Sequence, residues 1–369
     1  MQDTERALLE LVAIGLGKKV RATDFPYQVN WAKLYHLSQE HGVNAVAVDG
    51  LQRILQEYPN DERFVVKDAK AKMQRMQWIA QSLVLEKQYR YCEKVVSDLS
   101  AFYAQNDIRM MILKGYGLSL DWPTPAHRPM GDLDTYNFGK QPIADELVEK
   151  KLGIKVDDAY EHHTIFTYKG IMVENHYDFF NIYAHKSSRG LDRKLKEMAN
   201  NDCRCRKVYQ SFIYLPSAQF NALFLLRHTG HHFAGEHLIL RQIIDWAMFV
   251  DKHYDEVNWD ELIDTAKEYN IHCFLACLNA ICVDYIGIDP KKFPKLPVNS
   301  SLERRIIEDV LSPEFDDEKP SALLPVLLFK LKRWKNNVWK HRIVFNEGLF
   351  SMFMYLSWSH LKRYKTIKA

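Results

Sequence analysis

The segment Arg128-Pro129-Met130-Gly131-Asp132-Leu133-Asp134-Thr135-Tyr136 decides which fold we expect. Successive side chains of a β-strand point to opposite faces of the sheet. A strand over the second half of this segment therefore places Asp132 and Asp134 on one face and turns Leu133 toward the core. Two acids separated by one apolar residue in a predicted strand are candidates for a paired site.

A third acid lies in another predicted strand, Ile171-Met172-Val173-Glu174-Asn175-His176. If the two strands are neighbours, the carboxylates of Asp132, Asp134 and Glu174 converge. Their repulsion is relieved when divalent cations bind. Mg²⁺ prefers such oxygen ligands, and two ions can stabilise both oxygens of a displacement at phosphorus. We expect Asp132 and Asp134 to be metal ligands and Glu174 to be a ligand or the general base. The alternative is that Asp-x-Asp only marks a strand end.

A glycine turn precedes these acids. The apolar run Ile108-Arg109-Met110-Met111-Ile112-Leu113 predicts a buried strand, and Lys114-Gly115-Tyr116-Gly117 ends it. Backbone N–H groups of a glycine turn can bind phosphates. We therefore predict that Lys114, Gly115 and Gly117 bind a nucleotide, with Arg128 as a further phosphate contact. The alternative is a tight turn between a strand and a helix, with two solvated cations.

Taken together, residues 112–115, 128–134 and 173–176 resemble the bacterial "uncharacterised nucleotidyltransferase" family, which is similar to the polymerase-β-like superfamily. The resemblance extends more loosely to residues 31–43 and 228–245. It implies a sheet with the paired aspartates on one strand and the third acid on a neighbouring strand. It also implies Mg²⁺ or Mn²⁺ and transfer of a nucleoside monophosphate from a nucleoside triphosphate (NTP), with loss of pyrophosphate.

The sequence departs from the superfamily pattern at Tyr116. A small residue is usual after the first glycine of the phosphate turn, and the bulky tyrosine bears on the choice of nucleotide. The acceptor is not implied, because one fold serves many acceptors. A small molecule, a protein and RNA all remain open.

The expected fold class is α+β, a small mixed-sheet nucleotidyltransferase core flanked by helical regions. Residues 62–105 contain neither proline nor glycine, and their apolar residues recur at helical spacing, which predicts one long helix or two in line. Lys169-Gly170 predicts a two-residue hairpin turn between strands at 164–168 and 171–176. We therefore divide the chain into an N-terminal helical region (1–99), an α/β core (100–215) and a C-terminal helical region (216–369).

A histidine cluster, His228-Thr229-Gly230-His231-His232, lies in a predicted helix. Residues three and four apart share a helical face. The cluster is interpreted as a polar seam between the helices and the core, as a metal site, or as part of the cleft wall. In the last case His228 and His232, together with His176, line the cleft.

Basic residues concentrate near the C-terminus and are interleaved with Trp334 and Trp339: Lys330, Lys332, Arg333, Lys335, Lys340, Arg342, Lys362, Arg363, Lys365 and Lys368. Such segments can bind RNA through phosphate contacts and stacking, or an anionic membrane surface. More often they form the solvated face of an amphipathic helix. Leu328 and Leu331 fit the buried stripe of such a helix.

The composition is that of a globular protein, with 369 residues, a hydrophobic fraction of 47% and a net charge of +3. We expect a cytoplasmic protein without a transmembrane segment, because there is no signal-peptide pattern and no apolar run of about 20 residues. The six cysteines form no Cys-x-x-Cys pair and are expected to be thiols. The leading hypothesis is a Mg²⁺-dependent nucleotidyltransferase. The alternatives are a catalytically inactive nucleotide-binding protein that keeps the fold, and an RNA-binding protein.

Overall fold

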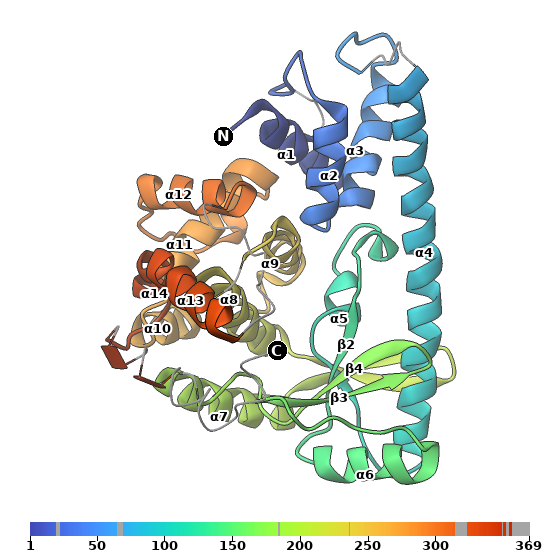
Figure 1. Cartoon of the computed structure of the whole chain (residues 1–369), viewed down its shortest axis with the longest axis vertical. Coiled ribbons are helices and arrows are strands. Elements are labelled where there is room, and N and C mark those ends of the chain that lie inside the picture. The colour runs from blue at the N-terminus through green and yellow to red at the C-terminus, as the bar shows by residue number, and fades with distance from the viewer. Residues whose placement is uncertain are drawn as a thin grey trace.

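The computed structural model describes residues 1–355, except 20–22, 65–68, 184, 236, 314–322, 349 and 352–353. Within these residues, helices at both ends of the chain flank a six-stranded mixed sheet (Figure 1), which confirms the predicted α+β class. The basic tail with Lys362, Arg363, Lys365 and Lys368 lies outside the described residues.

The N-terminal region is formed by helices α1 (Asp3–Gly15), α2 (Trp31–Glu40), α3 (Asn44–Glu57) and α4 (Ala69–Ala104). Helix α4 is a single helix of 36 residues and runs along one whole side of the molecule (Figure 1). Its first half packs on α2 and α3, and its second half packs on the sheet. There Ser97 Oγ donates a hydrogen bond of 2.8 Å to the carbonyl oxygen of Val208. One helix thus joins the N-terminal region to the core.

The sheet has the strand order β3-β4-β2-β1-β6-β5. Its strands are β1 (Met111–Ile112), β2 (Asp132–Tyr136), β3 (His163–Tyr168), β4 (Ile171–His176), β5 (Cys203–Val208) and β6 (Ser211–Pro216). The predicted hairpin β3–β4 is present, and both residues of its turn, Lys169 and Gly170, have positive φ. A two-residue turn with positive φ at both positions matches the twist of paired strands.

The hairpin β5–β6 and the helix α7 (Lys186–Asn201) were not predicted from the sequence. Strand β6 pairs parallel to β1, so the hairpin extends the sheet on the side away from β4. Strand β5 is one of the two edge strands and carries Arg204, Arg206 and Lys207. These charges hide the apolar alternation that would reveal a strand, although charged side chains are common on sheet edges.

The two faces of the sheet differ in character. On one face Ile112, Leu133, Phe166 and Val173 are buried in a cluster with the second half of α4 and with α6 (Gln141–Leu152). The prediction that Leu133 points into the core is confirmed. The acids next to Leu133 therefore project from the opposite face.

The C-terminal helices lie on the side of the molecule away from α4 (Figure 1). They are α8 (Ala218–Gly235), α9 (Leu240–His253), α10 (Trp259–Glu268), α11 (His272–Ile281), α12 (Ser300–Leu311), α13 (Leu323–Asn336) and α14 (Val338–Val344). A π-helical turn, Cys282–Ile286, follows α11 and packs against α1. The N-terminal and C-terminal helices share one hydrophobic cluster. The boundaries at 99 and 215 remain predictions. None of the described helices is long and apolar enough to cross a membrane.

The prediction that Leu328 and Leu331 form a buried stripe on the basic C-terminal helix is wrong. Their exposed fractions are 59% and 49% on the helix that carries them, α13. In α14, Lys340 is buried and its Nζ lies 2.5 Å from Asp309 Oδ2. The basic residues of these helices therefore do not all face solvent.

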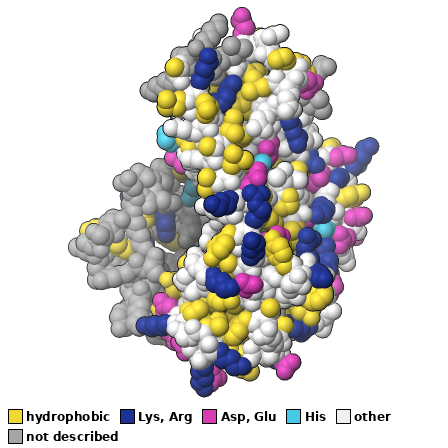
Figure 2. Space-filling model, turned by 90° about the vertical axis from the view of Figure 1, so that its right-hand side faces the viewer, with side chains coloured by type: hydrophobic (Ala, Val, Ile, Leu, Met, Phe, Trp, Pro, Cys, Tyr) yellow, Lys and Arg dark blue, Asp and Glu magenta, His cyan; other side chains and the backbone are white. Residues whose placement is uncertain are grey.

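The face of the molecule along α4 is mixed in character. Lys and Arg side chains are interspersed there with Asp and Glu, and hydrophobic side chains are exposed between them (Figure 2). On α4 these include Met73, Met76, Leu83 and Tyr91.

Candidate active site

The parallel pairing of β2 with β4 brings the predicted acids together. Asp134 is the register partner of Glu174, and Asp132 precedes it by two residues on the same strand. Because side chains alternate along a strand, all three carboxylates lie on the face opposite Leu133 and Val173. This is the arrangement that the sequence analysis required. Their catalytic roles remain a prediction.

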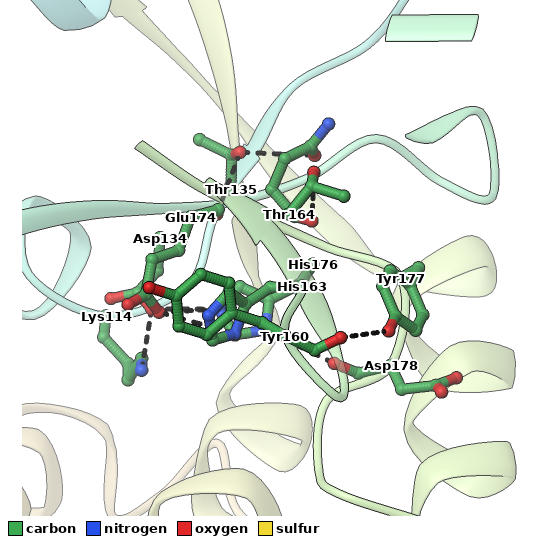
Figure 3. A network of polar contacts seen from close by, with 11 residues as sticks. Lys114, Asp134, Thr135, Tyr160, His163, Thr164, Glu174, His176, Tyr177 and Asp178 are labelled. Atoms are coloured by element: carbon green, nitrogen blue, oxygen red, sulfur yellow. Dashed lines mark hydrogen bonds and ion pairs between the residues drawn. The ribbon is translucent and has the colours of Figure 1, made fainter. Parts of the chain in front are cut away.

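Asp134 is the most buried of the three acids, with an exposed fraction of 2%. Its Oδ1 accepts from Lys114 Nζ at 2.7 Å and from His176 Nε2 at 3.0 Å (Figure 3). Burial raises the pKa of Asp134, but Lys114 and His176 outweigh it and hold the pKa far below its ordinary value. Reciprocally, burial lowers the pKa values of Lys114 and His176, yet the charge of Asp134 and its hydrogen bond to His176 leave both raised.

Glu174 and Asp132 are half-buried beside this pair. Glu174 Oε2 lies 3.6 Å from His176 Nε2. Burial raises the pKa of Glu174, but His176, His163 and Lys114 together outweigh it and leave the pKa lowered. The pKa of Asp132 is raised, first by burial and then by the charge of Asp134. Lys114 pairs directly with Asp134, and its charge lowers the pKa of Asp132 against burial and Asp134. The site therefore carries an excess of negative charge.

Donor chemistry and spacing fit a divalent cation. Asp134, Glu174 and His176 each offer a ligand atom, and these atoms lie within 4.8 Å of one another. Carboxylate oxygens are the ligands that Mg²⁺ and Mn²⁺ prefer. Asp132, two residues before Asp134 on the same face, supplies a further carboxylate at the margin of this group. The Lys114 ammonium already shows that Asp134 accommodates a cation.

The glycine turn lies against the acid strand. Gly115 begins the short helix α5 (Tyr116–Ser119) with φ of +45°, and a Cβ on it would lie 3.3 Å from the Asp132 carbonyl oxygen. A side chain at this position is disfavoured by the positive φ and by the close carbonyl oxygen. At Gly117 a Cβ would instead lie 3.3 Å from the Ile112 carbonyl oxygen, so this glycine allows close packing on β1.

Tyr116 does not project toward the carboxylates. Its side chain is buried, its ring stacks on Tyr89 of α4 at 5.8 Å, and its hydroxyl donates to Glu93 Oε1 at 2.8 Å. Burial and the bond to Glu93 raise the pKa of this hydroxyl. The bulky residue that departs from the superfamily pattern thus occupies the core between α4 and the sheet and leaves the turn open.

Arg128 is bound to a helix of the C-terminal region. Its Nε and Nη2 donate to the two oxygens of Asp245 on α9 at 2.7 and 2.8 Å, and Trp122 Nε1 donates to the same carboxylate at 2.9 Å. Burial lowers the pKa of Arg128, but Asp245 outweighs it and leaves the pKa raised. The predicted contact of Arg128 with a triphosphate therefore requires either a change of partner or an indirect role.

Histidines of α8 approach the same acids. His228 is half-buried, and its pKa is lowered well below the ordinary value, first by burial and then by the positive charge of Lys114. The ring centroids of His228 and His232 are 4.5 Å apart. Of the predicted cleft residues, His228 thus comes near Lys114 and Asp134, whereas His176 lies buried beneath the carboxylates.

Three further residues near the acids were given no role from the sequence. His162 precedes β3, His163 begins it, and Arg241 is the second residue of α9. The buried Arg241 Nε has no hydrogen-bond partner among the described atoms. Burial and the charge of Arg128 lower the pKa of Arg241, while Asp245 and then Asp132 oppose this. His162 and His163 could have been noticed in the sequence as an adjacent pair of histidines before a predicted strand. No local signal identifies Arg241.

Comparison with known proteins agrees with this geometry. A family model described as "Uncharacterised nucleotidyltransferase" matches residues 27–287 of the 369. The chain belongs to this family. The match covers the turn, both acid strands and the helices α8 and α9, and membership supports transferase activity. Searches of curated proteins and of solved structures gave no match.

Proposed function

We propose that the protein transfers a nucleoside monophosphate from an NTP to an acceptor hydroxyl and releases pyrophosphate. The observation that carries this proposal is the register of β2 and β4, which places Asp134 beside Glu174 and Asp132 on the same face. Membership of a nucleotidyltransferase family supports it independently. The acceptor is left open.

In the proposed reaction the acceptor oxygen forms a bond to the α-phosphorus, and the bond from that phosphorus to the bridging oxygen of pyrophosphate breaks. The acceptor proton passes to a carboxylate, for which Glu174 is our candidate because it is the least buried member of the Asp134–Glu174–His176 group. Asp132, Asp134 and Glu174 would hold Mg²⁺ or Mn²⁺, which supplies charge stabilisation at the transferring phosphoryl group.

Cations of this chain would bind the leaving phosphates. Lys114 is the first candidate, because its ammonium lies at the carboxylates and can turn toward a phosphate when a metal ion neutralises Asp134. Arg241 is the second candidate, since its half-buried guanidinium lies in the field of Asp132. Arg128, held by both oxygens of Asp245, would orient α9 and with it Arg241.

The decisive test is calorimetric binding of each NTP in the presence of Mg²⁺. We expect metal-dependent binding by the wild type and its loss in the double variant Asp132→Asn, Asp134→Asn. The matched control is Asp255→Asn, Asp264→Asn, which removes the same charge from exposed positions and should bind like the wild type. Binding that is equal in all three proteins would overturn the proposal.

Two other outcomes are informative. If no NTP binds to the wild type at millimolar concentration, the protein is better described as a catalytically inactive member of the family. If RNA binds in a salt-dependent manner and this binding survives in the double variant, the basic C-terminal helices become the functional surface. Turnover assays follow binding, because a transferase without its acceptor can be silent.

A further inference from the structure

A second group of potential metal ligands lies beside the carboxylates. His162, His163 and His176 each offer a ring nitrogen, and these nitrogens lie within 4.8 Å of one another. The centroid of the His163 ring lies 4.5 Å from that of the His162 ring and 5.2 Å from that of the His176 ring. The group meets the carboxylates at His176, which belongs to both sets of ligands.

The backbone of the hairpin β3–β4 fixes this group. His163 is the register partner of His176, so their rings are neighbours on one face of the sheet. The carbonyl oxygen of His162 accepts hydrogen bonds of 3.1 Å from the backbone N–H groups of Tyr177 and Asp178. Tyr160 stacks on the His163 ring at 5.1 Å (Figure 3). The histidines are thus held by strand pairing and not by a mobile loop.

Two of the three imidazoles in this group, His162 and His163, have buried ring nitrogens without a hydrogen-bond partner among the described residues, whereas the ring nitrogens of His176 contact Asp134 Oδ1 and the Asp178 carbonyl oxygen. His163 has an exposed fraction of 7%, and neither of its ring nitrogens has a hydrogen-bond partner in the described part of the chain. Its nearest acid is Glu174, whose Oε2 lies 3.8 Å from Nδ1, too far for a hydrogen bond. His162 Nδ1 is buried without a hydrogen-bond partner as well. A buried polar group left unpaired destabilises a fold, so an unpaired group in a fixed position indicates a missing ligand.

We propose that His162, His163 and His176 form a binding site for a divalent transition-metal ion, distinct in ligand chemistry from the carboxylate site. Neutral imidazole suits Zn²⁺ and Co²⁺, whereas carboxylate oxygens suit Mg²⁺ and Mn²⁺. Three protein ligands with an open position are typical of catalytic zinc sites. The site does not depend on nucleotidyl transfer, although the shared His176 places it next to the proposed reaction.

The test uses Co²⁺ alone, added to the metal-free full-length protein and followed by visible absorption and calorimetry. A site of imidazoles with few ligands gives Co²⁺ a strong visible band, which a six-coordinate oxygen site does not. We expect one Co²⁺ per chain. His163→Phe keeps the ring that stacks on Tyr160 but removes the ligand, and it should weaken Co²⁺ binding at least about tenfold.

Matched controls separate this site from others. His341→Phe replaces another buried histidine whose Nδ1 has no hydrogen-bond partner in the described residues, and it should leave Co²⁺ binding unchanged. Asp132→Asn should also keep Co²⁺ binding, while it weakens binding of Mg²⁺ and NTP. Failure of the proposed function and failure of this site are therefore seen in different measurements.

Three results would overturn the proposal. These are the absence of Co²⁺ binding by the wild type, equal affinity in His163→Phe and wild type, and binding that is lost in Asp134→Asn but kept in His163→Phe. Folding of each variant is checked by circular dichroism. If His163→Phe does not fold, His162→Gln serves instead, because His162 is half-buried and a polar side chain is tolerated there.

Discussion

The proline-rich segment at residues 122–129 and the acid strand that follows it use buried charge in opposite ways. In the proline-rich segment each cation has matched acids: Arg128 pairs with Asp245, and His127 lies between Asp49 and Glu86 at 2.6 and 3.2 Å. The acids belong to α9, α3 and α4. The segment therefore ties the N-terminal and C-terminal helices to the core.

On the acid strand the charges are not matched. Asp132, Asp134 and Glu174 share the ammonium of Lys114, and histidines supply the remaining contacts. The one-to-one pair of Arg128 and Asp245 stabilises one arrangement, whereas the three carboxylates around Lys114 can exchange partners and bind an added cation. We take the difference to separate a structural from a functional use of buried charge.

Arg128→Met should have the largest effect. It leaves Asp245 buried without its cation, and breaking a buried pair in this way costs about 3–5 kcal/mol. Urea unfolding of the variant and the wild type measures the difference. The control is Arg90→Met, because Arg90 forms only an exposed pair with Glu86 and should lose less than about 1 kcal/mol. If Arg128→Met lowered the free energy of unfolding as little as the control does, the proline-rich segment would not hold the helices to the core.

Lys114→Met should destabilise the protein by about 1–3 kcal/mol, less than Arg128→Met, because Asp134 keeps its hydrogen bond from His176. Added Mg²⁺ should restore this loss, since an ion at the carboxylates replaces the missing ammonium and stabilises the folded state by mass action. Melting temperatures with and without millimolar Mg²⁺ measure the effect. Recovery of Arg128→Met by Mg²⁺ to the same extent would contradict the distinction between the two regions.

The acid strand and the hairpin could be predicted because their signals are local. The alternation of polar and apolar side chains over Asp132–Tyr136 and the Lys169-Gly170 turn are each visible within a few residues. The burial of Leu133 follows from the alternation. The neighbourhood of β2 and β4 was a conditional expectation, which the resemblance to a known family made specific. The structure supplies the register.

The partners of the cations could not be predicted, because they lie far away in the chain. Asp245 is 117 residues from Arg128, and no local pattern connects them. The edge hairpin β5–β6 was missed since Arg204 and Arg206 conceal its alternation. The role of His163 depends on its register with His176, and that register exists only once the strands are paired.

Replacement of His127 should change how stability depends on pH. Burial lowers the pKa of His127, but its hydrogen bonds to Asp49 and Glu86 outweigh burial and raise the pKa above 6.5. The folded state thus binds the proton more tightly than the unfolded state. This contribution is complete below the unfolded pKa and is lost as the pH rises through the folded value.

His127→Gln should therefore cost about 1 kcal/mol at about pH 6 and less at about pH 9. Urea unfolding of both proteins across this range gives the difference. The variant His341→Gln provides contrast, because burial lowers the pKa of His341 to about 4 and its loss should not reproduce this trend. A His127→Gln penalty that grows with pH would contradict the assigned sign.

Asp132→Asn should have the smallest effect on stability, and the opposite sign. The pKa of Asp132 is raised by burial and by Asp134, so the ionised side chain destabilises the folded state relative to the unfolded state. An amide of the same shape removes the repulsion and should stabilise the metal-free protein by up to about 1 kcal/mol.

The same change should weaken Mg²⁺-dependent NTP binding at least about tenfold, because a carboxylate ligand is lost. Melting temperature and calorimetry, with Asp264→Asn as the exposed control, measure both effects. A gain in stability combined with a loss of binding would identify Asp132 as an acid retained for function, whereas a loss of both would assign it to the matched, structural class of the proline-rich segment.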